Sequence, residues 1–329
     1  MVDTVYLTTH EYSLRKDHKF VPNTKVKRNG QVLARLECNL FDKDFDKSGI
    51  NQHGGLTVQQ NTQTLYYNTS LPKLLYGHSL REVTPADLDR CIDTIRNQMV
   101  FAGLDVTADQ IEQMTVSRID YCRNIQIDHS IADYLYLLST GQMQRMVTDH
   151  KRERGSLLFK NGVCQFAIYD KVRELLADKK QRIAAGVAAD IPHNRLRFES
   201  RTFKSKNVQK LTGRQTLAEC FDLKIARARL LSDFDKLRID NQMIDTMNGF
   251  ELGYLFANYS RVQVEKYIAA QVILRAVDND FVLLAQYLSA RYKPRHVRNL
   301  INYYRSVCDR MRDRSKRDLL AELRYKLAA

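Results

Sequence analysis

Apolar and polar residues follow two different periodicities along this chain of 329 residues. Up to about residue 212, short stretches of alternating apolar and polar residues are mixed with helical patterns, whereas the remainder repeats with a period near 3.6 residues. The alternation predicts strands over residues 4–7, 32–40, 56–69, 115–127 and 195–202, and a hairpin over 156–170. We therefore expect an α+β domain, 1–212, with a central, mainly antiparallel sheet in two βαβ-like halves, and then an all-helical region, 213–329.

Cap and turn residues mark the elements between these strands. Ser70 is placed to cap a short helix that stops at Gly77. The sequence Thr84-Pro85-Ala86-Asp87 combines a cap, an N1 proline and an acid at N3 ahead of a longer helix. Further helices are expected from about 131 to 138 and from about 171 to 187. Within the hairpin, Asn161-Gly162 predicts a type I′ turn, which needs positive φ at both central residues.

The chain is strongly basic, and the excess charge is concentrated near its end. Its 52 Lys and Arg exceed 38 Asp and Glu, which gives a net charge of +14 and favours nucleic acid as partner. Residues 290–329 hold 12 Lys and Arg against four Asp and Glu. The segments 280–289 and 294–308 fit a helix-turn-helix with Arg295, Arg298 and Arg305 toward DNA. A plain helical bundle with a solvated basic face is the alternative.

Several other functions lack the sequence features that they need. The six cysteines include no C-x-x-C pair, which favours reduced thiols over a zinc site or a secreted disulfide framework. The first residues do not resemble a signal peptide, and no apolar run approaches the roughly 20 residues of a membrane span. No glycine is followed by lysine, so a Walker A loop is absent. We therefore expect a cytoplasmic protein with no membrane partner.

Strand alternation places polar side chains on one face of three expected strands. In the hairpin, Phe166 and Ile168 belong to an apolar face and Tyr169 to the opposite face. By the same alternation, Asp120 and Glu199 lie opposite the apolar residues of their own strands. The full polar set comprises Gln165 and Tyr169, Arg118 and Asp120, and Arg197, Glu199 and Arg201. A tyrosine and two acids on one sheet are a candidate catalytic site, although isolated surface ion pairs would give the same pattern.

This set of residues suits phosphodiester transfer through a tyrosine. A free tyrosine has a pKa near 10, so only about one in a thousand is ionised at pH 7 and the hydroxyl of Tyr169 needs activation. Lys171 is expected to stabilise the tyrosinate or the developing phosphorane charge. Glu174, one turn further, is expected to orient Lys171 or to complete a metal shell.

The acids suit a hard divalent cation. Asp120 and Glu199 are expected to hold Mg²⁺ or Mn²⁺, which would polarise the scissile phosphate. His78 is the expected nitrogen ligand, although no two histidines are spaced i, i+2 or i, i+4. Basic side chains near these acids are expected to contact DNA, namely Lys73, Arg118, Arg197 and Arg201.

At these residues the chain resembles the filamentous-phage replication initiators, the gene II/X family of phage and plasmid rolling-circle replication proteins. Five stretches match in the family's order: Met1-Val2-Asp3-Thr4, Ser70-x-x-Lys73-x-Leu75-x-Gly77-His78, Ser117-Arg118-Ile119-Asp120, Tyr169-x-Lys171-x-x-Glu174-Leu175 and Leu196-Arg197-Phe198-Glu199-x-Arg201. They extend over residues 1 to about 235. The chain lacks the His-hydrophobe-His pair of related nickases, and residues 236–329 match only in being helical and basic.

The resemblance implies a rolling-circle replication initiator. Such a protein nicks one strand of a double-stranded, locally single-stranded origin, and the family tyrosine falls on Tyr169, which would become linked to the 5′-phosphate. The free 3′-OH would prime the host polymerase in the bacterial cell, a host helicase would unwind the duplex, and a second transesterification would rejoin the displaced strand.

Two other functions stay open from the sequence. A mobilisation relaxase or transposase would use the same chemistry at a transfer origin or an element end. A non-catalytic, sequence-specific DNA-binding regulator would use the basic helical tail and form no covalent product. A membrane-surface protein is disfavoured, because acids interrupt the basic tail and it lacks a broad aromatic face.

Overall fold

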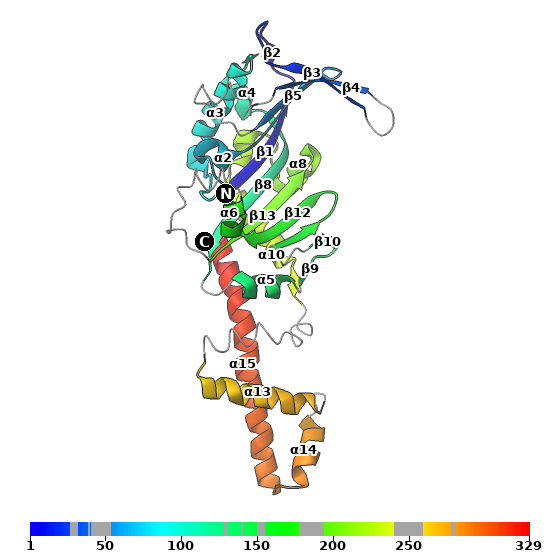
Figure 1. Ribbon diagram of the computed structural model, residues 1–329, viewed down its shortest axis with the longest axis vertical. Helices are drawn as coiled ribbons and strands as arrows, with labels where there is room; N and C mark the ends of the chain where they lie inside the picture. Colours follow the sequence, from blue (N-terminus) through cyan, green and yellow to red (C-terminus); the bar gives the residue numbers. More distant parts are fainter. Residues whose placement is uncertain are drawn as a thin grey trace. The chain divides into compact units, whose positions relative to one another are not determined.

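A 10-stranded antiparallel sheet organises the first part of the chain (Figure 1). This computed structural model describes residues 1–26, 32–38, 40, 54–127, 131–139, 141–149, 155–177, 194–239, 259–277 and 281–329. The strand order is β10-β11-β12-β13-β8-β1-β6-β5-β4-β3. The strands are β1 (Val2–Thr9), β3 (Val21–Val26), β4 (Val32–Cys38), β5 (Gly55–Gln59), β6 (Thr64–Ser70), β8 (Thr115–Gln126), β10 (Val147–Thr148), β11 (Ser156–Lys160), β12 (Cys164–Asp170) and β13 (Arg195–Phe203). The expected α+β class is confirmed.

Two of the helices that accompany the sheet lie where cap residues predicted them. The helices of the first part of the chain are α2 (Leu71–Tyr76), α3 (Leu88–Phe101), α4 (Ala108–Glu112), α5 (Ile131–Ser139), α6 (Lys171–Ala177), α8 (Ser205–Thr212), α9 (Leu217–Cys220) and α10 (Leu223–Asp235). The helix α2 ends at Gly77 in the left-handed region, at φ 75°, as expected. Thr84 and Asp87 form the expected capping box ahead of α3. The expected continuation of α6 to residue 187 lies outside the described residues.

Two local expectations were wrong. The predicted strand 56–69 is a hairpin of β5 and β6, because the four polar residues 60–63 form a turn in which Gln63 has a left-handed φ of 45°. The hairpin β11–β12 is confirmed, but neither Asn161 nor Gly162 has the positive φ of a type I′ turn. Instead, the side-chain oxygen of Asn161 accepts hydrogen bonds from the backbone N–H groups of Val163 and Cys164.

The two halves of the sheet are connected differently. In the first half, β6 and β8 each pair antiparallel with β1, which lies between them, so β6 and β8 run parallel and α2, α3 and α4 cross over between them. In the second half, β12 and β13 are neighbours, antiparallel, and joined through α6. The expected βαβ-like order is therefore present in the chain, but no two neighbouring strands of the described sheet are parallel.

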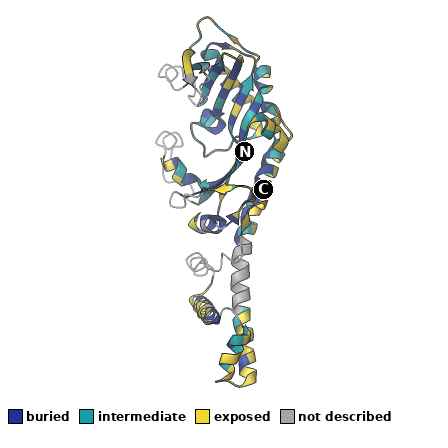
Figure 2. Cartoon of the chain, turned by 90° about the vertical axis from the view of Figure 1, so that its right-hand side faces the viewer, coloured by how far each residue is buried: buried dark blue, intermediate teal, exposed yellow. Residues whose placement is uncertain are grey.

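One face of the sheet is apolar and packed against helices (Figure 2). The hydroxyl of Tyr67 on β6 bonds to Gln98 of α3, and that of Tyr121 on β8 bonds to the last carbonyl of α9. Phe198 of β13 packs edge-on against Phe234 of α10. Because strand side chains alternate, the polar residues between these apolar ones lie on the opposite face.

Short strand pairs and a helical unit complete the described structure. The pairs are β2 (Ser13–Leu14) with β7 (Leu104–Asp105), and β9 (Gly141–Gln142) with β14 (Arg238–Ile239). The region after residue 212 is therefore mostly, not wholly, helical. The chain forms two compact units, 1–238 and 239–327, so the unit with the sheet continues past residue 212.

The second unit contains α13 (Arg261–Arg275), α14 (Phe281–Ser289) and α15 (Pro294–Ala328). Among the described residues of this unit, six buried apolar side chains form one core cluster: Ala270, Leu274, Val277, Leu284, Val297 and Ile301. Among the described residues, no helix has both the length and the apolar character that crossing a bilayer requires.

Candidate active site

Three neighbouring strands bring the expected tyrosine and acids to one face of the sheet. Tyr169 lies opposite Arg197, and Asp120 lies opposite Arg201, in the β12–β13 and β13–β8 pairings. Glu199 is two residues from Arg201 and therefore shares its face. The sequence-based assignment of these residues to one polar face is confirmed.

A bulge in β1 adds a third acid that alternation alone did not predict. Val2 pairs with Tyr121 and Thr4 with Asp120, so Asp3 is an extra residue between two register positions. Regular alternation would turn Asp3 toward the apolar face, together with Val5, but a bulge redirects the side chain. The register shift is the signal that sequence reasoning lacked, because it depends on the pairing of β1 with β8.

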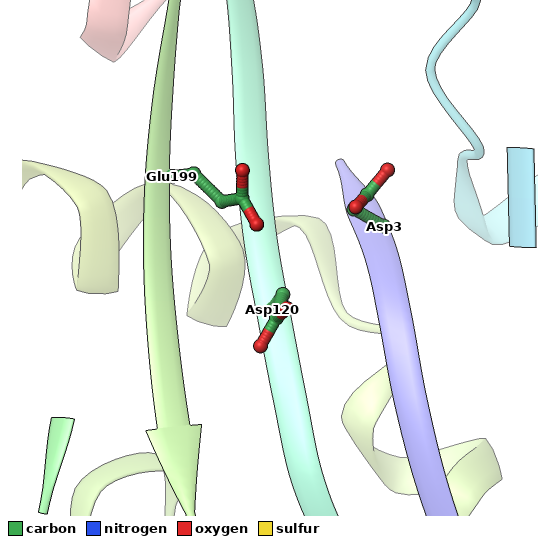
Figure 3. Close-up of side chains that lie close together, drawn as sticks. All are labelled: Asp3, Asp120 and Glu199. Atoms are coloured by element: carbon green, nitrogen blue, oxygen red, sulfur yellow. The ribbon is translucent and has the colours of Figure 1, made fainter. Parts of the chain in front are cut away.

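Asp3, Asp120 and Glu199 form a buried carboxylate cluster (Figure 3). Ligand oxygens of the three residues lie within 4.8 Å of one another, and the side chains come from β1, β8 and β13. His78, the expected nitrogen ligand, is not part of this cluster. Its Nδ1 instead accepts a hydrogen bond from the backbone N–H of Leu80 at 3.2 Å.

Each of the clustered acids has an arginine partner. Arg118 binds Asp120 through two hydrogen bonds, of 2.9 and 2.6 Å. The Nε of Arg201 donates to Glu199 at 2.9 Å. The third acid, Asp3, is paired with Arg197.

Arg197 differs from the other two arginines in being fully buried. Its Nη2 lies 2.5 Å from Oδ1 of Asp3; the two atoms form an ion pair but do not have the angles of a hydrogen bond. Its Nη1 donates a hydrogen bond to the carbonyl of Ser79 at 2.8 Å. Only 1% of its side chain is exposed. The expected DNA contact of Arg197 is therefore not possible in this structure, where the guanidinium is an internal counter-charge to the acids.

The hydroxyl of Tyr169 is directed at the carboxylate cluster. It donates a hydrogen bond to Oε2 of Glu199 at 2.9 Å. Burial raises the pKa of Tyr169 well above its ordinary value; Arg197 opposes this rise, and Glu199 adds to it. The phenol is therefore protonated at neutral pH in this arrangement.

Lys171 and Glu174 form a second ion pair beside the tyrosine. The Nζ of Lys171 lies 2.6 Å from Oε2 of Glu174 and 2.6 Å from Oγ of Ser79. Burial lowers the pKa of Lys171, and the nearby Arg197 lowers it further, while Glu174 opposes the shift. Of the two roles expected for Glu174, the contacts fit the orientation of Lys171. Ser79, which also contacts Arg197, was not predicted because nothing in its local sequence distinguishes it.

The carboxylate cluster has the donors that a hard divalent cation needs. Burial raises the pKa of Asp120 to about 7; hydrogen-bonded Arg118 opposes this rise, and the Glu199 carboxylate adds to it. Burial, the largest cause, disfavours the charged form of this carboxyl, and a bound cation would favour it. Carboxylate oxygens are the ligands that Mg²⁺ prefers, so Asp3, Asp120 and Glu199 would hold such an ion.

A cavity of about 220 Å³ lies over these residues. Of the expected site residues, it is lined by Lys73, Arg118, Asp120, Tyr169, Lys171, Glu174, Glu199 and Arg201. Asp3, Thr4, Ser70 and Ser79 complete its wall. The Oγ of Ser70 is buried without a hydrogen-bond partner among the described residues, so it can bond to a ligand. His78 and Arg197 do not line this cavity.

A family model for the N-terminal domain of a phage replication-associated protein, the gene II protein, matches residues 10–228, two-thirds of the chain. The chain belongs to this family. The matched range contains Asp120, Tyr169, Lys171 and Glu199, while Asp3 precedes it. The expected resemblance to the filamentous-phage gene II proteins is thereby confirmed, and the chain is a phage replication protein of this family. No curated protein and no solved structure matches the chain.

The three arginines expected to contact DNA through the C-terminal region belong to the second compact unit. Arg295, Arg298 and Arg305 are exposed on α15, while Val297 and Ile301 of the same helix are buried in the core of that unit. The guanidinium of Arg305 also lies 4.7 Å from the ring centre of Phe281 on α14. Residues 281–306 contain no Asp or Glu, so this helix pair presents an exposed cationic face.

Proposed function

We propose that this chain is a site-specific DNA nickase that initiates rolling-circle replication through Tyr169. The observation that carries the proposal is the hydrogen bond of the Tyr169 hydroxyl to Glu199, within a cavity that holds three clustered carboxylates and several cationic side chains. Membership in a family of phage replication proteins supports origin DNA as the substrate of this proposal.

The chain's own residues would act on a phosphodiester in this cavity. Arg118, Arg201 and Lys73 would hold the phosphate, and the buried hydroxyl of Ser70 would donate to one of its oxygens. The oxygen of Tyr169 would attack phosphorus while its proton passes to Glu199, the hydrogen-bond acceptor in this structure. The bond from phosphorus to O3′ would break, and O3′ would leave with its electron pair and take a proton from water.

Positive charge near the reacting atoms would stabilise the transition state. Lys171, held by Glu174 and Ser79, would offset the charge that develops on the phosphoryl oxygens. A divalent cation, Mg²⁺ or Mn²⁺, held by Asp3, Asp120 and Glu199 would polarise the phosphate and reduce the negative charge beside the phenol. The free 3′-OH would prime the host polymerase, a host helicase would unwind the duplex, and reversal of the same step would rejoin the displaced strand. The protein would act in the bacterial cytoplasm.

The proposal is tested by incubating the protein with its supercoiled replicon and Mg²⁺ or Mn²⁺. A denaturing gel should show a relaxed circle with the protein linked to a 5′ end, and peptide mapping should locate the link at Tyr169. Tight binding with no strand break under either metal would instead favour the non-catalytic regulator. Cleavage only at a transfer origin or at element ends would favour the relaxase or transposase.

We further propose that the cationic face of α14 and α15 holds the DNA duplex. Replacing Arg295, Arg298 and Arg305 together with glutamine should weaken DNA binding and flatten its dependence on salt. The slope of log K against log salt should decrease by roughly 0.9 for each phosphate that the variant no longer neutralises. Equilibrium binding measured across a series of salt concentrations would determine this slope.

A matched control exists in the same unit. Arg261 is also exposed, but it is paired with Glu265 on its own helix, at 2.7 Å. Arg261→Gln should leave the salt slope nearly unchanged. An equal decrease in this variant, or an unchanged slope in the triple variant, would contradict a specific role for the face that α14 and α15 form.

A further inference from the structure

A second cavity, of about 500 Å³, lies on the other side of Tyr169. We propose that it binds the nucleobase of the nucleotide immediately 3′ of the nick, whose 5′-phosphate would become linked to Tyr169. This inference rests on the proposed function and adds a position at which the origin sequence is recognised. The two cavities share Tyr169, Glu174 and Arg201, so DNA in one passes directly beside the other.

The walls of the second cavity have the chemistry of a nucleotide site. Leu158, Ala167 and Ala177 provide an apolar surface, and the side chain of Tyr169 forms another part of the wall. Arg173 and Arg201 provide guanidinium groups for a flanking phosphate, next to the acids Asp170 and Glu174 in the same wall. A flat aromatic base can stack or pack on apolar and aromatic side chains, while the backbone phosphates on either side of the nucleotide pair with arginine. The volume lies within the roughly 300–1,000 Å³ of small-ligand sites.

The small side chains make the space for this base. Ser156 pairs with Tyr169, and Leu158 with Ala167, so all four belong to the polar-site face of β11 and β12. Ala167, opposite Glu199, has only a methyl group where a larger side chain would fill the cavity. Ala177, an exposed residue at the end of α6, closes the cavity from the helix side.

The geometry of the reaction selects the nucleotide on the 3′ side. Attack and departure occur roughly in line, so the leaving O3′ lies on the far side of phosphorus from the tyrosine oxygen. The nucleotide 5′ of the nick is therefore directed away from Tyr169. The nucleotide 3′ of the nick keeps its ester bond, lies to the side of that line, and can fold back beside the tyrosine into the second cavity.

The test uses the full chain and single-stranded oligonucleotides that span the nick mapped with the unmodified protein. One oligonucleotide is intact, one is abasic immediately 3′ of the nick, and one is abasic immediately 5′ of it. The rate of covalent adduct formation at subsaturating DNA is measured. Loss of the 3′ base should slow the adduct by about 5- to 150-fold, as expected for one stacked base, and loss of the 5′ base should slow it much less.

Variants that fill the cavity connect this effect to the structure. Ala177→Leu, and Ser156→Val on the opposite wall, should slow adduct formation on intact DNA about as much as loss of the 3′ base does. On the 3′-abasic DNA, either variant should react at nearly the rate of the unmodified protein. Leu176→Phe adds bulk at the neighbouring exposed position, outside both cavities, and should behave like the unmodified protein. The inference would be overturned if a cavity-filling substitution slowed adduct formation as much on the 3′-abasic DNA as on intact DNA. It would also be overturned if loss of the 5′ base slowed the reaction more than loss of the 3′ base. Neither result would contradict the proposed nickase function. No adduct with the unmodified protein and intact DNA would overturn both.

Discussion

Replacing Tyr169 with phenylalanine is expected to reduce formation of nicked, protein-linked DNA by at least about a thousandfold, because the attacking oxygen is removed. The ring remains, so the walls of both cavities stay in place. The variant lacks the hydrogen bond to the Glu199 carboxylate, which costs about 1.5–3 kcal/mol of folding stability, as for other hydrogen bonds to charged groups. Affinity for origin DNA should stay within a few-fold of the unmodified protein, as measured in the absence of turnover.

A second tyrosine on the same sheet provides a matched control. Tyr66 on β6 is 38% exposed and donates to Gln59, away from the carboxylates. Tyr66→Phe should nick at a rate close to that of the unmodified protein. If Tyr169→Phe also nicks at that rate, Tyr169 is not the nucleophile. If both variants and the unmodified protein bind DNA without cleaving it, the regulator is the better explanation.

Much of the fold was predictable because it depends on local patterns. The alternation of Phe166, Ile168 and Tyr169 correctly sorted the faces of β12, and the capping box of Thr84 and Asp87 correctly placed the start of α3. The errors arose where pairing or side-chain contacts decided the outcome. A polar turn was hidden inside 56–69, and the side chain of Asn161 satisfied the backbone of its turn without positive φ.

The candidate site was predictable in composition but not in its environment. Asp120, Glu199 and Tyr169 were placed on one face from alternation, and the face was expected to be a polar exterior surface. In the structure, both acids are almost fully buried, and each is paired with an arginine, Asp120 with Arg118 and Glu199 with Arg201. Asp3 could not be found, since its direction depends on a bulge in a long-range strand pairing.

Asp120→Asn is expected to abolish most of the stabilisation by Mg²⁺ and to reduce nicking by at least about a hundredfold, because one of the three ligand charges is removed. The midpoint of thermal unfolding, measured with and without saturating Mg²⁺, reports binding independently of activity. A cation present at about 100 times its Kd stabilises a protein by about 2.7 kcal/mol, which corresponds to a shift of several degrees. Asp89, an exposed acid on α3, gives the control Asp89→Asn, which should respond to Mg²⁺ like the unmodified protein.

The dependence on pH adds a second test of the same residue. Burial raises the pKa of Asp120 to about 7 from an ordinary 3.8, so the metal-free folded state binds this proton more tightly than the unfolded chain does. The resulting stability is complete below pH 3.8 and is lost as pH rises through about 7. Mg²⁺ competes with the proton, so its stabilising effect should be larger about one pH unit above this pKa than about one unit below it. Asp120→Asn should remove both this loss of stability with rising pH and the pH dependence of the Mg²⁺ effect. If Mg²⁺ stabilises the unmodified protein equally at the two pH values, Asp120 is not a ligand.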